Sequence, residues 1–202
     1  MARVSKVGRR VWVAAALAVV IGAGLGVLYA MRQPELKAAA LAPYAAGSLA
    51  ALHVPREPPP TPDHAFRGPD GAEVTLVDFR GKVVVLNLWA MWCRPCRTEM
   101  PTLAALARSY ADQPDLLVLP VNVDATPAKV EEARAFLGGH APLPLYSDLS
   151  FQLPFELPGG GAMPKTVILD RQGRIRACYV GESDWSRPEV RALLDALLAE
   201  PA

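Results

Sequence analysis

The chain has 202 residues and a formal net charge of +1 at pH 7. This length fits one folded domain with an appendage. The near balance of charge gives no electrostatic basis for binding nucleic acid or a strongly acidic partner.

The N-terminal segment has the pattern of a membrane anchor. Basic side chains gather in residues 1–10, and residues 11–31 carry no charge. A membrane-spanning helix needs about 20 apolar residues, and basic residues before such a run predict a cytoplasmic N-terminus. We therefore expect a cytoplasmic tail over 1–10 and a single-pass anchor in the inner membrane over 11–31. The alternative is a cleaved signal peptide, whose apolar core is usually about 7–15 residues.

Residues 32–62 are rich in proline and alanine. Proline breaks helices, and the Pro58-Pro59-Pro60 run favours an extended, semi-stiff chain. We expect this segment to be a passive tether. It would join the anchor to a folded domain over 63–202, which lies on the periplasmic side of the membrane.

The segment 63–202 predicts an α/β fold. Near-continuous apolar runs are typical of strands that are buried on both faces of a sheet. Clusters of Gly, Pro and Asp mark turns between strands. The expected strands and hairpins are Val83–Trp89, Leu116–Val123, a hairpin over Phe66–Leu76, a short strand near Leu143–Tyr146, and a hairpin of Thr166–Asp170 with Arg174–Val180.

Three helices are expected to flank this sheet. The first runs from about Cys93 to Tyr110, where apolar residues recur at three- and four-residue steps. The second runs from Pro127 to about Leu137, with Thr126 as its N-cap. The third runs from Ser186 to about Glu200, and Glu189 stands at capping-box spacing from Ser186.

Cys93 and Cys96 are the most informative residues of the chain, because they stand where a buried strand ends and a helix begins. Unpaired N–H groups at a helix N-terminus stabilise a thiolate, which is the nucleophile in disulfide exchange. Cys96 lies one helical turn further on, so the two thiols can switch between dithiol and disulfide. The sequence therefore predicts a redox-active pair.

Other functions of this pair need more than the sequence offers. A closed zinc site needs two further ligands, and the third cysteine, Cys178, and the histidines His53, His64 and His140 are scattered. A purely structural bridge usually closes a longer loop. We therefore predict no metal site and no cofactor.

The segment Asn87–Pro101, which contains Trp92-Cys93-Arg94-Pro95-Cys96, is similar over its whole length to the signature of the membrane-anchored TlpA/ResA-like oxidoreductases of the thioredoxin superfamily. Further motifs of that group are Asp78–Lys82, Val121–Asp124, Gly161–Pro164 and Asp170-x-x-Gly173. The resemblance covers roughly residues 64–200 and is closest to the TlpA branch over Ala162–Trp185. It implies a central mixed sheet flanked by helices.

The resemblance also implies roles for residues. Cys93 becomes the exposed nucleophile and Cys96 the buried resolving thiol. Pro164 becomes a cis-proline that faces the pair, and it leaves the Met163 backbone free to pair with an extended client chain. Trp92 becomes part of the docking surface, while Arg94 and Pro95 support the site from within the motif.

The chain departs from the thioredoxin pattern at two positions. A buried aspartate is expected six residues before the nucleophile, but Asn87 stands there and cannot titrate. Proton transfer from Cys96 must then use water or another carboxylate, for which Glu99 is a candidate, although we favour Glu99 as a solvated charge on the helix surface. Lys165 follows Pro164 and, together with Arg94, is expected to favour a thiolate at Cys93.

We predict a periplasm-facing thiol–disulfide oxidoreductase. The resemblance implies a reductant recharged by a membrane dithiol transporter. It also implies clients that are metal-site or cytochrome assembly proteins, such as copper-centre factors of cytochrome oxidase or apocytochromes c. A copper-binding chaperone of the same fold is the alternative, because soft thiolates select Cu(I). A peroxidase is disfavoured by the Trp-Cys-x-x-Cys frame.

Overall fold

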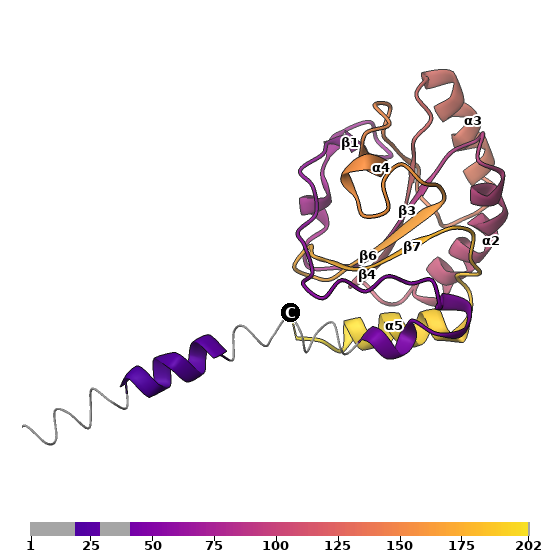
Figure 1. Cartoon of the computed structure of the whole chain (residues 1–202). Helices are drawn as coiled ribbons and strands as arrows, with labels where there is room; N and C mark the ends of the chain where they lie inside the picture. The colour runs from indigo at the N-terminus through magenta and orange to yellow at the C-terminus, as the bar shows by residue number, and fades with distance from the viewer. Residues whose placement is uncertain (1–18, 29–40, 202) are drawn as a thin grey trace, which may run out of the picture.

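The computed structural model describes residues 19–28 and 41–201 (Figure 1). Residues 19–28 are helical, and their large apolar side chains are 56–71% exposed. Within these two ranges, no helix is long and apolar enough to cross a bilayer. The predicted tail lies outside the described residues, as do residues 11–18 and 29–31 of the predicted anchor.

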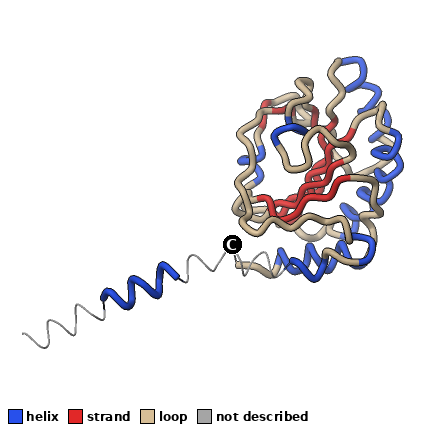
Figure 2. Tube along the Cα trace, in the orientation of Figure 1, coloured by secondary structure: helices blue, strands red, loops and turns tan. Residues whose placement is uncertain are grey.

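A seven-stranded mixed sheet forms the centre of the domain, with strand order β2-β1-β5-β4-β3-β6-β7. β3 runs parallel to β4 and antiparallel to β6, and all seven residues of β3 are buried, as its apolar sequence predicts. In Figure 2 the strands lie side by side in the middle, with helices outside them. The strands are β1 (Phe66–Arg67), β2 (Glu73–Val74), β3 (Val83–Trp89), β4 (Leu116–Asn122), β5 (Tyr146–Ser147), β6 (Lys165–Leu169) and β7 (Ile175–Val180).

Helices cover both faces of the sheet. Asn87 and Trp89 lie on one face of β3, because side chains alternate along a strand, and they contact Glu99 of α2 and Phe136 of α3. In Figure 1, α5 follows α2 along this side and the short α4 lies across the other. The helices are α2 (Arg94–Ser109), α3 (Pro127–Leu137), α4 (Leu153–Glu156) and α5 (Pro188–Leu198), with the 3-10 turns η1 (Ala42–Tyr44), η2 (Gly47–Leu49) and η3 (Leu76–Phe79).

The structure confirms the thioredoxin-like mixed sheet but moves some boundaries. α5 begins at Pro188 and its N-cap is Arg187, with no side-chain cap. The predicted cap at Ser186 is wrong, since the Ser186 hydroxyl donates instead to Asp184 Oδ1 at 2.6 Å. Ser186 therefore closes a local turn before the helix.

The described part of the expected tether, residues 41–62, packs against the domain. Leu41, Leu49 and Leu52 are buried in the core. His53 and Cys178 exchange two backbone hydrogen bonds of 2.8 and 2.9 Å, so this segment pairs with the outer edge of β7. Residues 41–62 are therefore not a passive spacer. They cover a sheet edge that would otherwise expose unpaired backbone groups.

Candidate active site

The two cysteines of the motif lie at the start of α2. Cys93 is the N-cap residue, and its Sγ accepts a hydrogen bond from the backbone N–H of Cys96 at 3.3 Å. Pro95 occupies the first turn, where a missing N–H costs nothing. Cys93 and Cys96 form a disulfide with their Cα atoms 5.3 Å apart.

The two cysteines of this disulfide differ in their exposure to solvent. Cys96 is fully buried, whereas Cys93 is 5% exposed, which is less exposure than the sequence interpretation implies. The neighbouring side chains are far more open: Trp92 is 62% exposed, and Arg94 is exposed as well. Of the two cysteines, Cys93 therefore has the more accessible surface, and it directly follows the exposed Trp92.

The loop that precedes Cys93 is held by the end of β4. The carboxylate of Asp124 is buried and accepts hydrogen bonds from the Met91 N–H and from Asn122 Nδ2, both at 2.8 Å. Sequence reasoning did not assign this role. The available signal was the Asn-Val-Asp run at the end of a strand parallel to β3, because adjacent parallel strands end at the same edge of a sheet.

A second segment expected at the site precedes β6. The Met163–Pro164 peptide bond is cis, as the resemblance implies. Met163 is half-buried and Pro164 is buried, and the Pro164 carbonyl accepts the N–H of Gly181 at 2.9 Å. That Pro164 faces the sulfur of Cys93 remains a prediction.

Glu99 differs from the sequence interpretation, which placed it in solvent. It is 1% exposed. Its Oε1 accepts from Asn87 Nδ2 at 2.7 Å, and its Oε2 accepts from the Ser183 N–H and from Trp185 Nε1, each at 3.1 Å. Burial disfavours the charged carboxylate more than these donors favour it, so the pKa of Glu99 rises to about 7.

Asn87 connects Glu99 to the sheet. Its Nδ2 donates to Thr166 Oγ1 at 3.0 Å as well as to Glu99. Its Oδ1 has no hydrogen-bond partner among the described residues. An amide with one unused acceptor can turn over and accept a hydrogen bond instead. Asn87 therefore suits a neighbour that is protonated at one time and ionised at another.

Lys165 also differs from expectation. Thr166 faces Asn87, so alternation along β6 turns Lys165 to the other face of the sheet. The buried Lys165 ammonium donates to the carbonyls of Pro154 at 2.6 Å, of Leu157 at 3.4 Å and of Gly160. Burial lowers the pKa of Lys165. The Lys165 ammonium thus binds carbonyls of α4 and of the segment that follows it. None of these contacts provides the support for a thiolate at Cys93 that the sequence had led us to expect.

Cys178, the remaining cysteine, lies on the same face as Lys165. It is 4% exposed, and its thiol donates to the Pro158 carbonyl at 3.3 Å. Burial raises the pKa of this thiol, so it is kept in its unreactive form. In the part of the chain that the structure describes, no three His, Cys, Asp or Glu side chains gather as a metal site would require.

The profile of the AhpC/TSA family matches residues 60–178. Two curated relatives resemble the same region. Thioredoxin-like protein YneN of Bacillus subtilis is 34% identical over 140 residues, which cover 66% of this chain and 77% of that protein. The thiol-disulfide oxidoreductase ResA of Geobacillus thermodenitrificans is 33% identical over 120 residues, which cover 59% and 67%.

Solved structures of similar proteins share the fold. The crystal structure of a putative thiol:disulfide interchange protein DsbE from Chlorobium tepidum has a TM-score of 0.56 and 33% identity, and the match covers 70% of this chain and 95% of that one. A secreted thiol-disulfide isomerase from Corynebacterium glutamicum has a TM-score of 0.61 and 26% identity, with 73% and 90% covered.

Proposed function

Since the chain belongs to the AhpC/TSA family and is a thiol–disulfide oxidoreductase, we propose that it reduces disulfides of client proteins through Cys93 and Cys96. The observation that carries this proposal is the disulfide at the N-terminus of α2, in which Cys93 is 5% exposed while Cys96 is fully buried. A helix N-terminus stabilises the thiolate that forms there on reduction.

The proposed reaction begins with the reduced pair. The Cys93 thiolate attacks one sulfur of the client disulfide, and the other client sulfur leaves as a thiolate that takes up a proton. Cys96 then loses its proton and attacks the Cys93 sulfur of the mixed disulfide. The client is released with two thiols. The two electrons that reduce it come from the cysteine pair, which becomes the Cys93–Cys96 disulfide.

Glu99 is the carboxylate proposed to receive the Cys96 proton. The two residues are three positions apart on α2 and so lie on the same side of the helix. A buried carboxyl whose pKa is about 7 exchanges protons readily at neutral pH. Asn87 cannot titrate, so Glu99 takes over the task of the strand aspartate in thioredoxins.

Trp92, Arg94, Pro95, Met163 and Pro164 form the proposed surface around the pair. Trp92 offers an exposed aromatic face beside Cys93. The backbone of Met163 is proposed to pair with an extended client strand. Arg94 is exposed at the first position of α2, where solvent screens its charge.

We place this reaction on the periplasmic side of the inner membrane, with residues 11–31 as the anchor and a membrane dithiol transporter as the electron donor. The exposed apolar side chains of the helix over residues 19–28 support an anchor. The proposed clients are copper-centre assembly factors and apocytochromes c, because metal and haem sites that use cysteine need reduced thiols.

Trapping of mixed disulfides tests this function. Cys96→Ser should accumulate covalent adducts with client proteins, because the resolving step is lost. Cys93→Ser should accumulate none, and the Cys178→Ser control should behave as the wild type. Equal trapping by the two active-site variants would contradict the assignment of Cys93 as the nucleophile.

A further inference from the structure

Three aromatic side chains form a row of edge contacts beside the cysteine pair. The rings of Trp92 and Phe151 are 6.2 Å apart at 72°, and those of Phe151 and Phe155 are 5.6 Å apart at 86°. Trp92 is 62% and Phe155 is 57% exposed, while Phe151 is half-buried between them. We call this set the aromatic row. Contiguous exposed apolar surface of this kind marks an interaction site.

The aromatic row begins and ends at segments of the candidate active site. At one end, Trp92 directly precedes Cys93. At the other end, the ring of Phe155 lies over Gly161, where a Cβ atom would stand 2.5 Å from the ring. Gly161 is two residues before Met163. The row therefore begins next to Cys93 and ends at the segment whose backbone is proposed to pair with a client strand.

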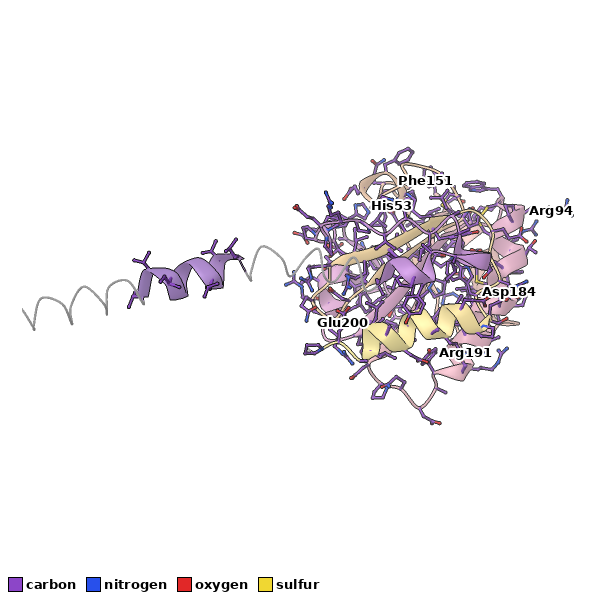
Figure 3. The ribbon with its side chains drawn as sticks, turned by 60° about the horizontal axis from the view of Figure 1, so that its bottom comes forward. His53, Arg94, Phe151, Asp184, Arg191 and Glu200 are labelled. Carbon is purple, nitrogen blue, oxygen red and sulfur yellow. A yellow bond between two sulfur atoms is a disulfide. The ribbon has the colours of Figure 1, made fainter. Side chains whose placement is uncertain are left out.

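The backbone around Phe151 is fixed in an uncommon conformation. Phe151 has φ +56°, in the left-handed region that bulky residues rarely adopt. The buried carboxylate of Asp148 accepts the N–H groups of Ser150, Gln152 and Leu153 at 2.9–3.0 Å. These bonds hold the chain on both sides of Phe151. In Figure 3, Phe151 lies at the opposite end of the domain from Arg191 on α5.

The imidazole of His64 fixes the same loop from the N-terminal side. It lies 3.3 Å from Asp148 Oδ1 and 3.1 Å from Glu156 Oε1. Glu156 is the neighbour of Phe155 in α4. The rings of the row are thus presented by a loop that is ordered before any partner arrives, which lowers the entropy lost on binding.

We propose that the aromatic row binds an apolar side chain, preferably an aromatic one, that flanks the disulfide-forming cysteine of the client. The proposal rests on the proposed function and deepens it, because it names the clients as segments with an apolar residue next to cysteine. Because the row lies next to Cys93, it would contact the client residues that flank the reacting cysteine. Because its rings expose both edges and faces, another aromatic ring packs well against them. Phe151 and Phe155 become specificity-determining residues.

Two peptide disulfides test this proposal with the reduced full-length chain. Each is a mixed disulfide between glutathione and a short cysteine peptide. The two peptides are identical except that the residue next to the cysteine is Phe in one and Ser in the other. The measured quantity is the ratio of the second-order rate constants for the two peptides. We expect the wild type to prefer the Phe peptide by about fivefold to tenfold, the effect of one well-placed aromatic contact.

Three variants test whether the aromatic row causes the preference for the Phe peptide. Phe155→Ser should reduce the ratio to near one. Gly161→Ala, which displaces the Phe155 ring and deletes no aromatic group, should also reduce it. Leu149→Ser is the matched control: Leu149 is 41% exposed on the same loop but lies outside the row, so the ratio should persist.

The possible results separate the two proposals. A damaged exchange centre lowers both rates within one variant and leaves their ratio intact, so it does not imitate loss of the row. A wild-type ratio near one, or a ratio that survives Phe155→Ser, overturns the aromatic row as a binding surface while the exchange function stands. A reduced wild type that exchanges with neither peptide contradicts the proposed function and this inference with it.

Discussion

Replacement of Glu99 by Gln should change how stability depends on pH. The pKa of Glu99 is about 7 in the folded protein, against an ordinary value of 4.5. Between these values the folded state keeps a proton that the unfolded state has lost. The stability that this proton provides is complete below pH 4.5 and is lost as the pH rises to 7. A difference of about 2.5 pKa units corresponds to about 3 kcal/mol.

Glutamine fits the same contacts without titrating. Its carbonyl oxygen can accept from the Ser183 N–H and from Trp185 Nε1, which now donate to Glu99 Oε2. Its amide can donate to Asn87 Oδ1, which has no partner among the described residues, once the Asn87 amide turns over. Glu99→Gln should therefore add only a pH-independent offset while it removes the pH-dependent loss.

The assay is urea unfolding of the oxidised wild type and of Glu99→Gln, from pH 4.5 to pH 8. The free energy of unfolding of the variant minus that of the wild type should increase by about 3 kcal/mol over this range. Glu132→Gln is the control, because Glu132 is half exposed and pairs with Lys129 on the surface. Parallel curves for wild type and Glu99→Gln would refute the raised pKa and with it the proton-acceptor role.

Three further predictions follow from other positions. Lys165→Met should lower the free energy of unfolding by about 2 kcal/mol or more, because three carbonyls lose their donor; unchanged urea midpoints would contradict this. Pro164→His should slow exchange with clients and raise affinity for zinc or copper, by adding an imidazole beside the thiolates; rates and metal titrations equal to wild type would show that residue 164 does not face Cys93. A reporter that works only outside the cytoplasm should be active when fused after residue 60; activity of a cytoplasm-only reporter there would reverse the predicted orientation.

Local patterns predicted most of the fold. β3 was recognisable because its apolar run needs no knowledge of the partners that bury it. α3 was recognisable from Thr126 and Pro127, since a cap and its first turn are neighbours in sequence; the Thr126 side chain does accept the Lys129 N–H. The cysteine pair was located by the same kind of short-range signal, a strand that ends directly before a helix.

The wrong predictions concern residues whose environment is built from distant parts of the chain. Glu99 looked like a surface charge because its donors Asn87 and Trp185 are 12 and 86 positions away. Lys165 looked like a neighbour of Cys93 because Pro164 precedes it, but strand alternation sends it to the opposite face. Burial of a charged side chain depends on tertiary partners, and no periodicity in the sequence reports them.

Asn87, which stands where thioredoxins have a buried aspartate, is compatible with the buried Glu99 in a way that an aspartate would not be. A buried carboxyl on β3 next to a buried Glu99 would place two acids in contact, and ionisation of one would strongly disfavour ionisation of the other. With Asn87 on the strand, the amide donates to Glu99 when it is ionised and, after turning over, accepts from it when it is protonated. The titrating group has thus moved from the sheet to α2, the helix that also carries Cys96. Under the proposed mechanism, proton transfer during resolution then stays within one helix, which is also the helix whose N-terminus stabilises the attacking thiolate of Cys93.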